Sequence, residues 1–123
     1  MSPRMSAATV AELARVGLLA ELPGEKLAKL AERMSREYVP AGTEIVREGE
    51  FGSRFYVVVA GLLAVTQDAR GERALLRPGD YFGEVAPAMG IRRTASVRAI
   101  TPSTVASCDR VAFDEFVKPL LGD

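Results

Sequence analysis

The chain contains no histidine and no tryptophan and has a single cysteine, and these absences exclude several kinds of chemistry. Without histidine it lacks the commonest zinc ligand, the usual general base and the Ser-His-Asp triad. Cys108 cannot form an internal disulfide, which fits a reducing compartment, and its neighbours favour a packed side chain over a reactive thiol. We therefore expect no metal or other cofactor, and an enzyme is the function class that the composition favours least.

The chain also lacks a surplus of either charge and any long apolar run. Its 16 Lys and Arg residues balance 16 Asp and Glu residues, whereas a chain built to bind nucleic acid normally has a basic excess. No apolar stretch approaches the roughly 20 residues that span a bilayer, and the first nine residues contain no signal-peptide core. We expect a cytoplasmic protein with no nucleic-acid partner and no membrane span in this chain.

What remains is a composition typical of one globular domain. The chain has 123 residues, of which 48% are hydrophobic and 26% charged, enough for a single core without disulfides. Residues 1–8 have the composition of a flexible tail, and we expect residues 9–123 to form the domain.

Residues 9–35 carry the signals of helices. Thr9 with Glu12 three residues later forms the pattern of a capping box, and Pro23-Gly24 interrupts the helical spacing that follows. A second helix is predicted beyond this break, because apolar residues recur there at helical spacing. These residues are Leu27, Leu30, Ala31 and Met34.

Residues 36–110 change to short segments rich in aromatic and β-branched residues, with glycine or proline turns about every 8–12 residues. The pattern predicts strands at 38–42, 43–47, 54–60, 62–67, 72–76, 94–100 and 104–108. Residues 111–121 then read as a closing helix. The predicted fold is mainly β, a double-stranded β-helix or jelly-roll barrel with flanking N- and C-terminal helices.

One segment of this β-region has residues suited to an anion. Gly83 permits a close backbone approach and opens a turn whose N–H groups attract negative charge. Ten residues later Arg93 opens a strand on which Ala95, Val97 and Ala99 share its face. A guanidinium at the end of an otherwise apolar inward face can pair bidentately with a phosphate.

Glu84 lies beside this anion site, where a carboxylate suits a sugar hydroxyl better than a phosphate. One arginine, one glutamate and several backbone donors match a small ligand with one negative charge and a free hydroxyl, a description that fits a cyclic nucleotide. A triphosphate fits poorly, because the segment contains no P-loop lysine.

Residues 82–86 (Phe-Gly-Glu-Val-Ala) and 92–97 (Arg-Arg-Thr-Ala-Ser-Val) resemble the phosphate-binding cassette of cyclic-nucleotide-binding domains. That family includes regulatory subunits of cAMP-dependent kinase, catabolite activator protein and cyclic-nucleotide-regulated channels. Weaker agreement in the turns upstream extends the resemblance to most of the chain. The resemblance implies a non-catalytic sensor of cAMP or cGMP, with the cassette at residues 82–97 and a short helix inside it. A sensor acts on an effector protein or fused domain, which the sequence does not specify.

The resemblance also implies a role for each matching position. Glu84 would hold the ribose 2′-hydroxyl, and Arg93 would pair with the cyclic phosphate. The backbone N–H groups of Gly83 and Ala86 would help to cradle that phosphate. The Thr94 hydroxyl would contact the phosphate or the guanine amino group. We further expect the closing helix to shift against the β-roll when ligand binds.

Other functions compete with this interpretation. Pro87 replaces an apolar residue of the cassette and lacks an N–H, which favours a ligand-free structural or protein-interaction domain of the same fold. A DNA-binding regulator would need a helix-turn-helix after the closing helix, so we do not expect DNA binding unless the chain is a fragment of a longer protein. A cupin-like metal oxidase would share the β-roll but would need histidine ligands. Each site residue also has an interpretation without a ligand. Arg93 would then be an ion-paired surface arginine, Glu84 a solvated turn carboxylate and Thr94 a strand former.

Overall fold

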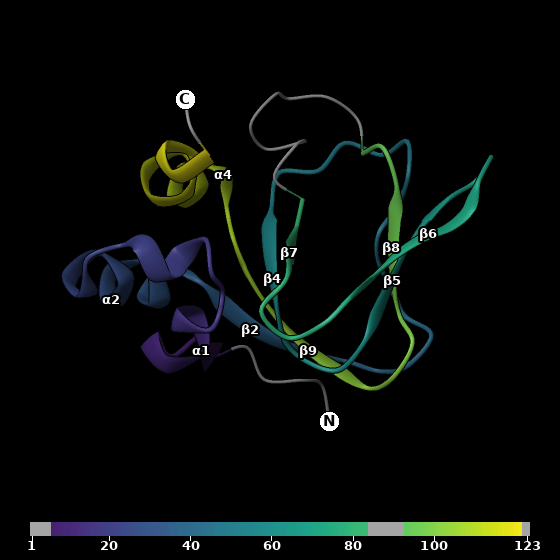
Figure 1. Ribbon diagram of the computed structural model, residues 1–123. Coiled ribbons are helices and arrows are strands. Elements are labelled where there is room, and N and C mark those ends of the chain that lie inside the picture. The colour runs from purple at the N-terminus through teal and green to yellow at the C-terminus, as the bar shows by residue number, and fades with distance from the viewer. Residues whose placement is uncertain (1–5, 84–92, 122–123) are drawn as a thin grey trace.

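A computed structural model describes residues 6–83 and 93–121, which form two antiparallel β-sheets with helices at one end (Figure 1). A five-stranded sheet has the order β1-β2-β9-β4-β7, and a four-stranded sheet has the order β3-β8-β5-β6. The strands are β1 Ser6–Ala7, β2 Ser35–Val39, β3 Glu44–Val46, β4 Phe55–Ala60, β5 Leu63–Gln67, β6 Gly71–Leu76, β7 Tyr81–Phe82, β8 Ser96–Ala99 and β9 Ser103–Cys108. The predicted mainly β fold with flanking helices is confirmed.

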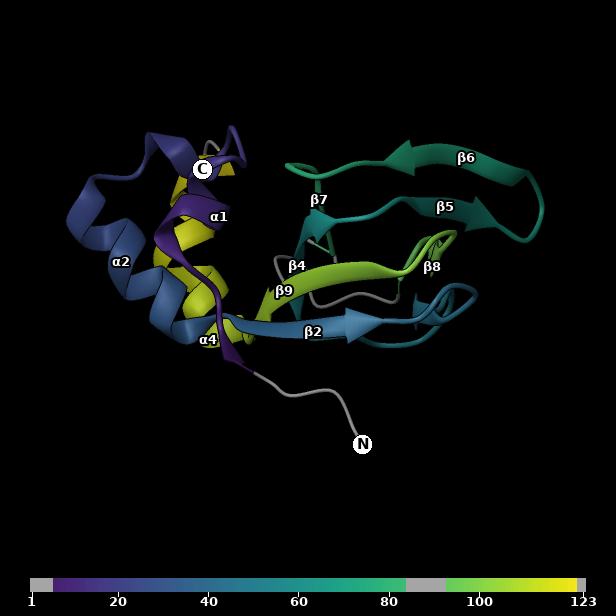
Figure 2. The same ribbon diagram turned by 90° about the horizontal axis from the view of Figure 1, so that it is seen from below.

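The helices lie on one side of the five-stranded sheet (Figure 2). They are α1 Val10–Ala14, the short 3₁₀ turn Leu19–Glu21, α2 Gly24–Arg33, and a closing helix that begins as α4 Arg110–Ala112. The closing helix continues as a π-helical segment, Phe113–Val117, and ends in a 3₁₀ turn, Lys118–Leu121. No helix within residues 6–83 and 93–121 is long and apolar enough to cross a membrane.

The period of two along β4 divides the core into two parts. Phe55 and Val57 face the helices, whereas Val58 faces the space between the sheets. The helix-side cluster also contains Leu13, Leu30, Ala106, Cys108 and Phe113, and the cluster between the sheets contains Val39, Leu63, Phe82, Val97, Ala99 and Val105. The five-stranded sheet is therefore buried on both faces where it separates the helices from the second sheet.

The capping box predicted for the first helix is present. The Thr9 hydroxyl oxygen accepts a hydrogen bond from the Glu12 N–H at 3.1 Å, and the Glu12 carboxylate accepts one from the Thr9 N–H at 2.9 Å. In the second helix the predicted inward residues Leu27, Leu30 and Ala31 are buried, and Met34 is buried at its C-terminal cap. The local signals therefore predicted where both helices begin. The first helix was expected to continue to the break at Pro23-Gly24, whereas α1 ends at Ala14 and only the 3₁₀ turn Leu19–Glu21 follows before that break.

The boundaries at the two ends differ from the prediction. Ser6–Ala7 pairs with β2 where a flexible tail over residues 1–8 was expected, and the Ala8 N–H donates to the Met34 carbonyl at 3.0 Å. Pairing with a strand remote in sequence leaves no local signal, which is why the pattern missed it. The closing helix begins one residue early, because the Asp109 carboxylate accepts from the Ala112 N–H at 2.9 Å and caps it.

The only cysteine is buried in the helix-side core. Burial raises the pKa of the Cys108 thiol to about 12, so the thiolate is absent at neutral pH. This confirms the expectation of a packed side chain rather than a reactive thiol.

Candidate ligand-binding site

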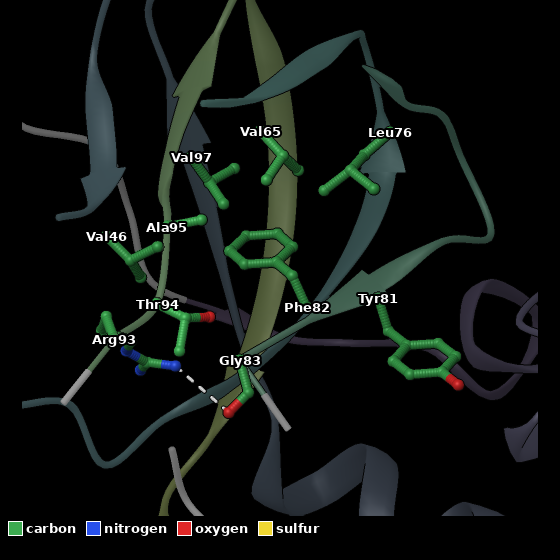
Figure 3. Close-up of a pocket in the computed structure, with 10 residues that line it drawn as sticks. All are labelled: Val46, Val65, Leu76, Tyr81, Phe82, Gly83, Arg93, Thr94, Ala95 and Val97. Carbon is green, nitrogen blue, oxygen red and sulfur yellow. Dashed lines mark hydrogen bonds between the residues drawn. The ribbon is translucent and has the colours of Figure 1, made fainter. Parts of the chain in front are cut away.

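A hollow of about 230 Å³ lies between the two sheets. Its apolar lining consists chiefly of Val46, Val65, Leu76, Phe82, Ala95 and Val97. In Figure 3 the side chains of Val65, Leu76 and Val97 converge on the ring of Phe82. The surface is suited to a flat, largely apolar group.

Arg93 lies at one end of this hollow and is 7% exposed. It is the only charged residue that is buried among those the structure describes. Its Nη1 donates to the Gly83 carbonyl at 3.1 Å, and its Nη2 donates to the Arg54 carbonyl at 2.9 Å (Figure 3 shows the first). Since burying a charge is costly unless it is hydrogen-bonded, these two carbonyls help to stabilise the guanidinium here.

The backbone of Arg93 is fixed as firmly as its side chain. Its N–H donates to the Glu50 carbonyl at 2.8 Å, and its carbonyl accepts from the Gly49 N–H at 2.9 Å. Ala95, Val97 and Ala99 follow on the same inward face, as predicted, while Arg98 between them is exposed. Regular strand begins only at Ser96, two residues later than the sequence pattern indicated.

Two glycines make room for the guanidinium. A Cβ on Gly52 would overlap the Nε and Nη2 atoms of Arg93. A Cβ on Gly83 would lie 2.8 Å from Arg93 Nη1 and 2.8 Å from the Arg54 carbonyl oxygen, and its φ of +91° favours glycine in any case. The backbone therefore approaches the arginine more closely than any other residue type would permit.

Residues 36–119 match the family model described as cyclic nucleotide-binding domain. The chain belongs to this family. The match confirms the resemblance drawn from residues 82–86 and 92–97. It covers both sheets except β1 and the first residue of β2, together with most of the closing helix.

Individual relatives agree with this assignment. The cAMP-dependent protein kinase regulatory subunit of Debaryomyces hansenii is 36% identical over 104 residues, which cover 85% of this chain and 23% of that protein. The cGMP-dependent protein kinase isozyme 1 of Drosophila melanogaster is 38% identical over 117 residues, covering 90% of this chain and 15% of that protein. The chain thus spans less than a third of the length of these curated relatives.

A solved structure extends the comparison to three dimensions. The regulatory domain of Toxoplasma gondii PKA, crystallised with cAMP, has a TM-score of 0.86 and 29% identity to this chain. The similarity covers 90% of this chain and 44% of that one. The two-sheet arrangement with flanking helices is therefore the fold of a cyclic nucleotide-binding domain.

Within this cyclic nucleotide-binding domain, three of the five predicted site residues are described. Arg93, Thr94 and Gly83 all line the hollow. Thr94 is exposed, and its carbonyl accepts a hydrogen bond from the Gln67 side-chain amide at 3.0 Å. Glu84 and Ala86 lie outside the described residues, as do Pro87 and the short helix expected in the cassette.

Gly83 contributes to the site through an atom that the sequence did not indicate. The prediction concerned its N–H as an anion donor, whereas the contact seen here is its carbonyl, which accepts from Arg93. Gly52 and Arg54 were likewise not predicted as part of the site. Arg54 and Arg93 are 39 residues apart, and no local pattern indicates a contact across that distance.

Tyr56 supports the wall of the hollow from behind. Its ring stacks on Phe82 with centroids 4.8 Å apart and an interplanar angle of 3°. Burial raises the pKa of the Tyr56 phenol, while the positive charges of Arg93 and Arg54 act in the opposite direction. The phenol therefore stays neutral at physiological pH, and the stack fixes Phe82 as a stable surface of the site.

Proposed function

We propose that this domain binds a cyclic nucleotide, cAMP or cGMP, in the hollow and acts as a non-catalytic sensor. The observation that carries the proposal is the buried Arg93 guanidinium at the end of an apolar pocket. A ligand that matches it has one anionic group attached to a flat apolar body. A cyclic nucleotide has both, and the relatives named above are kinases and kinase subunits whose names refer to cAMP or cGMP.

The roles follow from this assignment. Arg93 pairs with the cyclic phosphate, and the purine lies against the apolar lining around Phe82. The N–H groups of Gly83 and Ala86 help to hold the phosphate, and Glu84 accepts a hydrogen bond from the ribose 2′-hydroxyl. Thr94 contacts the phosphate or the amino group of guanine.

The proposal extends to the partner of the domain and to its cellular location. Because the chain spans 23% of the Debaryomyces hansenii regulatory subunit, we infer that residues 9–123 act on a fused domain or an effector protein. A cytoplasmic location agrees with a ligand of this kind and with the single buried cysteine. The domain transmits binding and leaves the nucleotide unchanged.

The experiment that tests the proposal is isothermal titration of cAMP and cGMP into wild type and Arg93→Ala. Wild type should bind at one nucleotide per chain, and Arg93→Ala should lose about 2–5 kcal/mol of affinity because the phosphate then enters without its counter-charge. Arg73→Ala, an exposed arginine of β6, serves as the matched control and should bind as wild type does.

Two outcomes would contradict the proposal. Undiminished affinity in Arg93→Ala would show that the phosphate assignment is wrong. No heat of binding with either nucleotide in wild type would favour the alternative, a ligand-free structural or protein-interaction domain of the same fold.

A further inference from the structure

Arg54 makes two separate connections, one through its backbone and one through its side chain. Its carbonyl accepts the hydrogen bond from Arg93 Nη2 at 2.9 Å. Its own guanidinium donates twice to Ser107, from Nε to the hydroxyl oxygen at 3.0 Å and from Nη2 to the carbonyl oxygen at 3.2 Å. Arg54 therefore links Ser107 to the arginine of the pocket.

The Ser107 end of this link is rigid. Ser107 lies in β9, is 6% exposed and pairs with Tyr56 of β4. β9 lies between β2 and β4 in the five-stranded sheet, so it is held on both edges. Two hydrogen bonds from one planar guanidinium to β9 therefore fix the orientation of the Arg54 side chain.

The other end needs such support. Gly52, Ser53 and Arg54 precede β4 and lie in no regular strand, so ladder hydrogen bonds do not hold their carbonyls. The Arg54 carbonyl nevertheless has to remain in place to receive Arg93 Nη2. The two hydrogen bonds from the Arg54 side chain to Ser107 help to fix residue 54 just before β4 begins at Phe55.

We propose that Arg54 is a positioning residue of the phosphate site, holding its own carbonyl, and through it the Arg93 guanidinium, at the orientation that the ligand needs. The inference rests on the proposed function. In this positioning role Arg54 does not contact the ligand and affects its affinity only through Arg93. A merely attractive charge would act equally well as lysine, whereas positioning requires the forked guanidinium.

The test is a double-mutant cycle built from Arg54→Lys and Arg93→Lys, with cAMP affinity measured by isothermal titration. Arg54→Lys keeps the charge and loses the fork, and should weaken cAMP binding by about tenfold, the usual effect of losing a charged hydrogen bond. Arg93→Lys already removes the guanidinium that donates to the Arg54 carbonyl. In that background the Arg54→Lys substitution should therefore change cAMP affinity by less than about twofold.

Ser107→Ala gives a second, independent approach to the same contact. It removes the hydroxyl acceptor and leaves the Ser107 carbonyl, so a smaller loss of about threefold is expected in wild type and none in Arg93→Lys. Arg73→Lys is the control for an arginine outside the pocket, and urea unfolding of each variant confirms that it is folded. If Arg54→Lys does not fold, the Ser107→Ala pair carries the test.

The results separate this inference from the proposed function. Failure of wild type to bind cAMP overturns the proposed function. Binding by wild type with undiminished affinity in Arg54→Lys overturns the positioning role. Equal losses from Arg54→Lys in both backgrounds also overturn it, because Arg54 would then act on the ligand without Arg93.

Discussion

At the scale of single residues, the site depends on how closely the backbone approaches one guanidinium. Gly52 and Gly83 each occupy a position where a Cβ would meet Arg93. The two carbonyls that receive Arg93 belong to Gly83 and Arg54, so the arginine is held by main-chain atoms from two loops. Main-chain acceptors of this kind fix the orientation of a guanidinium.

Thr94 offers a test of base selectivity at this scale. Thr94→Ala should weaken cGMP binding by about 0.5–1.5 kcal/mol, because the guanine amino group loses a hydrogen-bond acceptor, and should weaken cAMP binding less. Competition titrations with both nucleotides measure the two losses on the same protein. Equal losses would remove Thr94 from base recognition and leave it a phosphate contact or a strand former.

Single residues were predictable where a local period applied. The inward face of Arg93, Val97 and Ala99 followed from alternation along a strand, because that period depends only on the backbone. Arg54 and Gly52 were not predictable in this way. Their importance comes from contacts with Arg93 across the fold, which composition and spacing do not encode.

At the scale of elements, β9 connects the pocket to the closing helix. Ser107 receives Arg54, and two residues later Asp109 caps α4. The ion pairs from Arg33 to Asp109 and Glu115, both 3.7 Å long between half-exposed side chains, contribute little. The closing helix is held instead by its buried residues Ala112, Phe113, Phe116 and Val117.

Because the closing helix follows directly from the strand that Arg54 grips, we expect ligand binding to alter it. Backbone amides of residues 110–121 should change their hydrogen exchange when cAMP is added at saturation, measured by mass spectrometry. The same amides in Arg93→Ala, measured at the same nucleotide concentration, are the control and should change much less. Identical exchange in residues 110–121 with and without nucleotide would contradict a shift of this helix.

Elements were predictable to the extent that their signals were local. The capping box of Thr9 correctly predicted where the first helix begins, and the helical spacing of Leu27 and Leu30 correctly predicted the second helix. The end of α1 at Ala14 was not predicted. The two-residue strand Ser6–Ala7 was missed, because it exists only through pairing with β2. The order of strands within each sheet was likewise not predicted, since it depends on long-range pairing.

At the scale of the whole molecule, one sheet serves two purposes. The five-stranded sheet covers the helix-side core with one face (Figure 2). Phe82 and Tyr56 belong to the cluster on its other face, and Ser107 of β9 accepts the hydrogen bond from Arg54. The hollow is lined by residues from both sheets, including β5, β7 and β8, so a ligand bound there as proposed would contact both. Binding should therefore stabilise the native fold as a unit rather than one loop.

This leads to a prediction for the stability of the entire domain. A ligand that binds only the native state adds RT ln(1 + [L]/Kd), or about 2.7 kcal/mol at a concentration one hundred times Kd. For a domain of this size, that free energy should raise the melting temperature by about 10 °C. Circular dichroism melts of wild type with and without cAMP measure the shift, and Arg93→Ala at the same concentration should show a much smaller one. A wild-type melt unmoved by saturating cAMP and cGMP would mean that the native state binds neither, since binding restricted to the native state must raise its stability.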